Sequence, residues 1–460
     1  MSTPLDYDTL MLILVDLDIP DISRFSRTCR TIHHNAMAHL VNASSEKMTP
    51  QKFFNFCDFL CVDVSRILLL YTLHIPVGSA EKDQVDNICK ILDNAQNLQS
   101  LSVWKCEELL TLDERISSAI ASLPKLTALT LRESSTRVTN LVVKLQCPIQ
   151  ELSITCWLNE FDPEYIANAS ATGYQHWYPV PYTQSVLETV HTLTLQSRGS
   201  INPVVPLFYT FPNLRRLRIS INNTYSRDLP IRSREASREA NSNEQRDTMV
   251  HHWQELQELT GTCYDMYALA LSCHVQYLNI VGFVVSAGHM SRICTGCRPK
   301  ALTADFISFN DTLDIVNRGA RPSGVLEQPN LQCVTTTIDI ARRQITADDN
   351  TDYARLHVDT VNILRHFFRK SSIQELNLSV MSSRPISAAK NPMIQYLTSL
   401  EPEEFVRLIS EEIPSLQKMA LNIRLSWKDY RKSYWRVHKR VGKNVEAEKL
   451  DKPFKSLVST

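Results

Sequence analysis

The sequence has few glycines and none of the common catalytic motifs. Only 10 of its 460 residues are glycine, and none falls in the GxGxxG or P-loop spacing that cradles phosphate groups. The GxSxG and HExxH motifs are missing as well. We therefore expect a binding protein without a cofactor rather than an enzyme, because nothing in the chain points to an unrecognised catalytic site.

Long apolar stretches and an excess of one charge are also missing. The run LMLILV near the start has six residues and is followed by an acid, whereas a membrane helix needs about 18 apolar residues. Lysine plus arginine and aspartate plus glutamate number 49 each, so no net charge attracts nucleic acid or an anionic membrane. We expect a soluble intracellular protein, cytoplasmic or nuclear, that binds neither of these partners.

The cysteines do not follow a disulfide pattern. All 12 are scattered through the chain, mostly in apolar segments, which is typical of reduced core residues. The one tight pair is Cys294 and Cys297, in CTGC. A structural zinc site needs a second such pair, and a redox pair should open a helix after a strand. Both interpretations stay open at this pair, but we expect no metal site.

The first forty residues contain two amphipathic helical stripes. The apolar side chains recur at three- and four-residue spacing, which places them on one face of each helix. Between the stripes, Pro20 suits a first helical turn, and Asp18 or Asp21 can cap the second helix. The stripes consist of Leu10, Ile13, Leu14 and Leu17, and then of Ile22, Phe25, Ser26 and Cys29.

The order of these residues resembles an F-box, whose pattern runs Leu-Pro-x-Glu-apolar-Leu-x-x-Ile-Leu-x-x-Leu and then Asp-Leu-x-Arg-Leu-Ser-x-Val-Cys-Arg. The chain departs from this pattern at Asp6, Thr9 and Thr28. The resemblance implies that residues 1–45 dock onto a Skp-family adaptor and thereby join a cullin-RING ubiquitin ligase as its substrate receptor. The matching residues are Leu5, Asp8, Leu10, Ile13, Leu14, Leu17, Asp21, Ile22, Arg24, Phe25, Ser26, Cys29 and Arg30.

The apolar positions of this motif are expected to form the adaptor-docking surface and the local core behind it. The sequence does not say which of them face outward. An alternative interpretation is that the helices are a generic amphipathic hairpin that caps a larger domain, since such stripes are common. The candidate residues are Leu5, Leu10, Ile13, Leu14, Leu17, Ile22, Phe25 and Cys29.

One short pattern recurs beyond residue 45: an apolar residue, two variable residues, Leu, one variable residue and another apolar residue. Its alternation of apolar and polar positions predicts a half-buried strand at each copy. Several copies follow a helical segment that ends in a proline, so helices and strands should alternate. The clear copies begin at Leu98, Leu126, Ile149, Val190, Leu214, Val275, Ile373 and Leu416, and the weaker ones at Leu256, Ala301 and Leu331.

This arrangement resembles an irregular leucine-rich-repeat solenoid, with a curved parallel sheet on its concave side. The closest copies are about 23 to 28 residues apart, and three gaps widen to about 42 residues. The fold class is therefore α/β, with a small N-terminal helical F-box and a repeat domain over residues 98–426. A generic α/β domain with leucine-rich strands is the alternative interpretation.

Three segments lie outside the clear repeats. Residues 46–97 predict a connecting region with two helices and a first strand, and the F-box should pack directly on it. Residues 223–248 have almost no large apolar side chains, so we expect a disordered insertion, or alternatively a recognition loop controlled by phosphorylation. Residues 427–460 mix basic and aromatic residues and are expected to form a C-terminal cap, most simply a helix, or a tail that stacks on bases or acidic partners.

These observations predict that the repeat domain binds a protein substrate on its concave face or inserted loops while the F-box recruits the ligase. Gln99, Ser100 and Ser102 are substrate-binding candidates by position only. The partners would be a Skp-family adaptor, a cullin-RING ligase and an unidentified substrate. The competing interpretation is a leucine-rich-repeat scaffold that binds proteins without any ubiquitin role.

Overall fold

The computed structural model divides the chain into two compact units. Unit 1 comprises Met1–Leu214 and Ile221–Ser226, and unit 2 comprises Arg215–Ser220 and Arg227–Thr460. The structure describes residues 9, 12–14, 17–28, 30–44, 48–134, 136–156, 186–197, 205–221, 231–247, 253–283, 287–305, 328–339, 362, 371–381, 397–424, 430–439 and 445–453.

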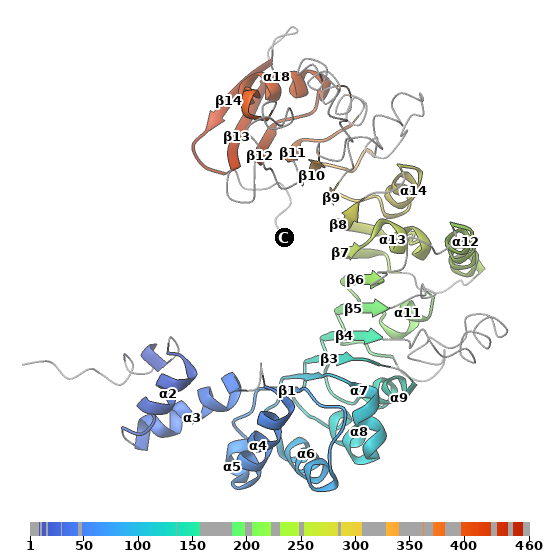
Figure 1. Ribbon diagram of the computed structural model, residues 1–460. Helices are drawn as coiled ribbons and strands as arrows, with labels where there is room; N and C mark the ends of the chain where they lie inside the picture. Colours follow the sequence, from blue (N-terminus) through green and yellow to red (C-terminus); the bar gives the residue numbers. More distant parts are fainter. Residues whose placement is uncertain are drawn as a thin grey trace, which may run out of the picture. The chain divides into compact units, whose positions relative to one another are not determined.

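Parallel strands in chain order form the sheet of unit 1 (Figure 1). Equivalent leucines pair across all of them, in a row that starts at Leu73 and Leu101 and ends at Leu193. This row and the next apolar row, which contains Ile75 and Val103, are buried. Because side chains alternate along a strand, the residues between these rows lie on the other face. The strands are β1 (Thr72–Ile75), β2 (Ser100–Val103), β3 (Ala128–Arg132), β4 (Glu151–Cys156) and β5 (Thr192–Ser197).

The same hydrogen-bond arrangement opens successive strands. The carbonyl oxygen of Tyr71 accepts from the amides of Gln99 and Ser100, at 2.9 and 3.0 Å. One repeat later, the carbonyl of Gln99 accepts from Thr127 and Ala128, both at 2.9 Å. This shared acceptor holds each turn against the preceding repeat, so the register passes from strand to strand.

Helices follow the strands of unit 1 and pack against one another. Helices α6, α8 and α9 lie in a row on one side of the strands (Figure 1). A capping box between Glu81 and Gln84 begins α6. The helices are α2 (Ile19–Phe25), α3 (Arg30–Ser44), α4 (Pro50–Cys61), α5 (Val64–Ile67), α6 (Lys82–Asn94), α7 (Cys106–Leu112), α8 (Glu114–Ala121), α9 (Thr136–Lys144) and α11 (Val205–Thr210).

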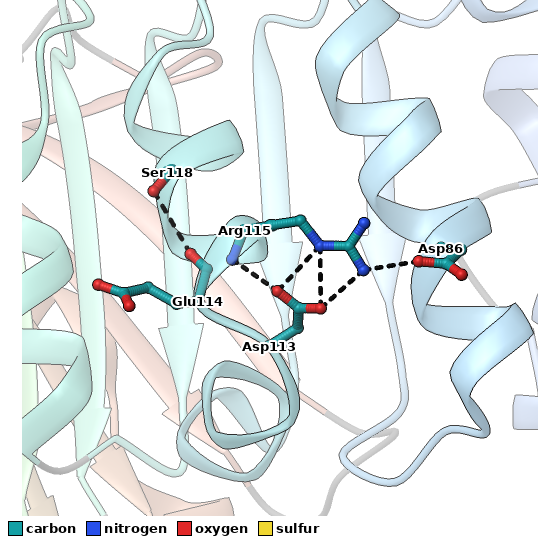
Figure 2. A network of polar contacts seen from close by, with 5 residues as sticks. All are labelled: Asp86, Asp113, Glu114, Arg115 and Ser118. Carbon is teal, nitrogen blue, oxygen red and sulfur yellow. Dashed lines mark hydrogen bonds and ion pairs between the residues drawn. The ribbon is translucent and has the colours of Figure 1, made fainter.

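An exposed arginine connects two of these helices. The Arg115 guanidinium contacts the Asp113 carboxylate at 2.7 Å and Asp86 of α6 at 2.6 Å (Figure 2). The hydrogen bonds from Arg115 lower the pKa of Asp113. Asp113 also caps α8 by accepting from the Arg115 amide. This contact is one of several polar links between successive repeats.

The sheet of unit 2 is parallel until its last strands. β12 pairs antiparallel with β13, and β13 pairs antiparallel with β14. Helices α12, α13 and α14 contact one another in order, and α18 packs on the last strands. The strands are β6 (Arg216–Ile221), β7 (Glu255–Gly261), β8 (His274–Phe283), β9 (Ala301–Asp305), β10 (Cys333–Asp339), β11 (Glu375–Met381), β12 (Lys418–Arg424), β13 (Tyr430–Lys439) and β14 (Val445–Leu450), and the helices are α12 (Ile231–Asp247), α13 (Cys263–Leu269), α14 (Ala287–Cys297) and α18 (Pro402–Glu412).

All eleven copies of the recurring pattern coincide with a strand, including the three weaker ones. The helix expected after residue 50, the first strand and the next helix are confirmed as α4, β1 and α6. The packing of the N-terminal helices on residues 46–97 is also confirmed, because α3 contacts α5. None of the helices in the described part of the chain is long and apolar enough to cross a membrane.

The expectation of disorder over 223–248 is wrong for residues 231–247, which form α12. The apolar content is as low as expected, but the helix binds its neighbour through polar side chains. Asn241 donates to the carbonyl of Ala268 at 2.8 Å, and Arg238 donates to the carbonyl of Tyr267 at 2.7 Å. These carbonyls lie in the last turn of α13, where the Tyr267 carbonyl also accepts from the backbone amide of Ala270 at 3.3 Å.

The expected C-terminal cap helix is also wrong, because residues 430–439 and 445–450 are strands. Trp435 and Val437 are buried while their neighbours Arg436 and His438 are exposed. This two-residue period belongs to a strand with one covered face. Residues 425–429 and 440–444, which flank and join these strands, lie outside the described residues.

Candidate binding surfaces

The N-terminal helices α2 and α3 enclose a small core of their own. It consists of Leu14, Ile22, Ile32 and Ala36. The Asp18 carboxylate begins α2 by accepting from the Asp21 amide at 3.0 Å. α2 is the helix that the second apolar stripe predicts, and Asp18 marks the expected break before it. Of the first stripe, residues 12–14 are helical, and Leu10 lies outside the described residues.

The candidate docking residues separate into distinct environments. Leu14 and Ile22 are buried in this core, so their side chains stabilise the module instead of facing a partner. Ile13, Leu17 and Phe25 are partly exposed. The remaining candidates lie outside the described residues: Leu5, Leu10 and Cys29.

Sequence reasoning missed Leu12, whose side chain is 70% exposed. It lies in LMLILV, where every residue is apolar, so the run itself does not distinguish the covered face from the open one. Only the packing of Leu14 into the core separates the two. An exposed leucine beside a buried one is an available contact for another protein.

Asn42 attaches this module to the first strand of the repeats. Its amide oxygen accepts from the amides of Tyr71 and Thr72, at 2.7 and 3.1 Å. Its amide nitrogen donates to the carbonyls of Leu69 and Ala38, at 2.9 and 2.7 Å. One side chain thus joins α3 to the edge of the sheet by hydrogen bonds in both directions.

A groove of about 820 Å³ lies between the module and the edge of the sheet. Leu17 and Pro20 line it from the α2 side, His39 from α3, and Tyr71 from the segment before β1. The apolar side chains and the rings of His39 and Tyr71 make up most of the lining of the groove. The groove is therefore suited to an apolar side chain of another protein.

The uncovered face of the unit 1 sheet is the second candidate surface, here called the open face. It carries one row through Thr72 and Ser100 and another through His74, Ser102 and Thr130. None of these residues is buried. Short hydroxyl side chains predominate, so a partner could approach the backbone closely and find hydrogen-bonding groups along the sheet. Ser100 and Ser102 lie on this face, as expected from their positions.

The close cysteine pair lies inside α14. Cys294 and Cys297 are both buried, and burial raises the pKa of Cys294 to about 12. A neutral, covered thiol is neither a ready metal ligand nor a redox nucleophile. In the described part of the chain, no group of three or more His, Cys, Asp or Glu side chains could hold a metal ion.

No protein-family model matches the chain, and no curated protein sequence does either. Among solved structures, a similar one is the leucine-rich repeat-containing protein LegL7 from Legionella pneumophila, which is 11% identical with a TM-score of 0.37. That match covers 77% of this chain and 91% of the other.

The architecture of the chain itself is consistent with a leucine-rich-repeat-like solenoid. Its strands follow one another in chain order within each unit, helices follow most of the parallel strands, and leucines form a continuous row through the sheet of unit 1. The resemblance of residues 1–45 to an F-box rests on the sequence pattern alone.

Proposed function

We propose that this protein is the substrate-recognition subunit of a Skp/cullin/F-box ubiquitin ligase. In this role the N-terminal module binds a Skp-family adaptor, and the open face of unit 1 holds a protein substrate. The chain contributes binding, not bond making. The observation that carries the proposal is the module itself, because Leu14 and Ile22, at F-box positions, pack with Ile32 and Ala36 of α3 in a small separate core, with Leu12 left exposed.

The energetics of such a contact fit this module. A helix that binds in a groove obtains most of its affinity from a few apolar side chains that become fully covered. Leu12 is exposed, and Ile13 and Phe25 are partly exposed. Covering an exposed leucine contributes roughly 1.5–3 kcal/mol. These side chains could therefore anchor an adaptor without any rearrangement of the core.

The test is co-expression of the full chain with a Skp-family adaptor, followed by size-exclusion chromatography with light scattering. Wild type should elute as a stoichiometric complex. Leu12→Asp should weaken the complex by about 30-fold or more, because it puts a charge into an apolar contact. Val62→Asp is the matched control, since Val62 is 79% exposed at the end of α4, and it should leave the complex intact. A wild-type chain that elutes alone would refute the proposal.

The second candidate function is a protein-binding scaffold whose N-terminal helices cap the repeats. Three hydrogen bonds of Asn42, with Leu69, Tyr71 and Thr72, favour it, because they attach α3 to the backbone at the edge of the sheet, as a solenoid cap requires. If the protein has this function, the full chain should be a stable monomer that does not bind the adaptor. Light scattering of the purified chain without adaptor distinguishes the two, since an uncovered docking surface should promote association.

A further inference from the structure

In the described part of unit 1, the open face carries one large apolar side chain, Trp104. It directly follows β2, and its amide donates to the carbonyl of Ile75 at 2.9 Å. The side chain is 42% exposed. Among the described residues at the other positions of this face, the side chains are hydroxyls, an alanine, a proline, polar groups and charged groups. Trp104 is therefore an exposed apolar side chain surrounded by a mostly polar surface.

Two side chains from the neighbouring strands hold the indole ring in place. His74 of β1 meets it edge-on, with ring centroids 5.8 Å apart. Arg132 of β3 places its guanidinium carbon 4.6 Å from the indole centroid. We call His74, Trp104 and Arg132 the Trp104 cluster. Since the ring is fixed before any partner arrives, binding loses little side-chain entropy.

The repeat geometry builds this cluster. Val103 pairs with Leu131, so Trp104 and Arg132 occupy equivalent positions one residue later. The residue after each has a left-handed backbone, with φ of 45° at Lys105 and 54° at Glu133. Non-glycine residues adopt this conformation at a cost and often near functional sites. At Lys105 and Glu133 the backbone turns away from the strand, and the side chains of Trp104 and Arg132 remain on the open face.

The charge of Arg132 has no counter-ion in the described part of the chain. A second arginine shows the contrast, because Arg66 lies 4.2 Å from the Phe59 ring but also lies 4.0 Å from the Asp63 carboxylate. Arg132 makes the aromatic contact alone. Its guanidinium can still donate several hydrogen bonds in a fixed planar geometry that matches a carboxylate.

The surroundings favour an extended protein segment as the occupant. Ser100, Ser102 and Thr130 make a shallow path with hydroxyl groups along the sheet. The cluster lies at the end of this path. We infer that the Trp104 cluster anchors a protein segment in which an Asp or Glu side chain, paired with Arg132, lies next to an apolar side chain packed on the indole. This inference deepens the proposed function, because it rests on the open face being the substrate surface.

The experiment uses the full chain and a phage-displayed library of random dodecapeptides. Enriched peptides are synthesised with their acids intact and with Asn or Gln in their place, and affinities are measured by fluorescence anisotropy. The enriched peptides should contain Asp or Glu beside an apolar residue. Replacing the acid, Trp104→Ala and Arg132→Gln should each weaken binding by about tenfold or more. Phe59→Ala, which alters the aromatic partner of Arg66, is the matched control and should bind as wild type does.

Unfolding tests and the adaptor assay separate the possible failures. By circular dichroism, Trp104→Ala and Arg132→Gln should melt at the same temperature as wild type. A loss of binding would then come from the missing side-chain contact and not from unfolding. Peptides without acids, or peptides that bind Trp104→Ala as tightly as wild type, would overturn the inference. A phosphoserine peptide that binds about tenfold tighter than its Asp version would overturn the choice of carboxylate. If peptides behave as expected while the adaptor does not bind, only the ligase proposal fails.

Discussion

A single residue, Asn42, connects two parts of unit 1 that are far apart in the sequence, since Asn42 and Tyr71 are separated by 29 positions. Its side chain accepts hydrogen bonds from two backbone amides and donates hydrogen bonds to two backbone carbonyls. The acceptor contacts involve Tyr71 and Thr72, at the start of the first strand. A strand at the edge of a sheet leaves such amides without a strand partner, and Asn42 satisfies them with a side chain.

We expect Asn42→Ala to lower the free energy of unfolding by about 1–2 kcal/mol, because it removes hydrogen bonds and leaves the amide of Thr72 without a partner inside the protein. Urea unfolding measures the loss. Hydrogen exchange should show faster exchange at the Tyr71 and Thr72 amides. Asn55→Ala is the control, since Asn55 is exposed and makes one long contact with Gln51. Equal stability of the two variants would contradict this role for Asn42.

At the scale of elements, α12 shows how a helix with almost no apolar residues is held in place. Asn241 and Gln245 are buried, although both are polar. Gln245 donates to the carbonyls of Leu269 and Ala270, at 3.2 and 3.3 Å. Side-chain donors placed at the carbonyl end of α13 take the role of a cap, and the favourable dipole of that end adds to the contact.

We expect the double variant Asn241→Ala with Gln245→Ala to detach α12 from α13. Alanine favours helix more than either residue, so any loss of order would come from the lost contact. Limited trypsin digestion should cut the arginine bonds within 231–247 about tenfold faster or more. Asn243→Ala changes an exposed residue on the same helix and should leave the rate at the wild-type value. Protection of the double variant would show that other contacts hold α12.

The last two strands, β13 and β14, show how the described part of the sheet ends. β13 pairs with β12, and β14 forms the final edge of the sheet. β14 carries Glu446, Glu448 and Lys449 in six residues. Charged side chains along an edge strand discourage pairing with another chain. In the described residues after 424, the sheet therefore ends in two strands and no helix.

At the scale of the whole molecule, the cysteines predict how stability depends on pH. Burial raises the pKa of Cys263, Cys273 and Cys294 to about 12, from an ordinary value of 9.0. The folded chain therefore keeps protons that the unfolded chain loses above about pH 9. The stability that these thiols contribute is complete below pH 9.0 and is lost as the pH rises toward 12.

Between about pH 10 and 12 we expect the free energy of unfolding to fall by about 1.4 kcal/mol per pH unit for each such thiol. Urea unfolding at about pH 9, 10 and 11 measures the slope. Lysines and tyrosines also begin to titrate in this range, so the comparison is with Cys294→Ala, which should reduce the slope by one thiol. Equal slopes for wild type and variant would show that Cys294 titrates as it does in the unfolded chain.

Much of the repeat fold could be predicted because its signal is local. In LTALTL and IQELSI the apolar residues alternate with polar ones, and the strand that results buries every second side chain. The same period marks β13, but the aromatic and basic residues around Trp435 hide it. For the candidate site, the second stripe predicted α2, and residues 12–14 of the first stripe are helical as expected. They did not predict that Leu14 would be buried and Leu12 exposed, because that depends on how the helices cross.

The sequence by itself determined the alternation of helix and strand and the leucine rows of the sheet, since both follow from spacing within a few residues. Only the tertiary structure decided that α12 is ordered, that Asn42 attaches α3 to β1, and that Trp104 lies between His74 and Arg132. Each of these depends on hydrogen bonds or ring contacts with residues 27 to 30 positions away. Local spacing carries no information about such partners, because the fold alone brings them together.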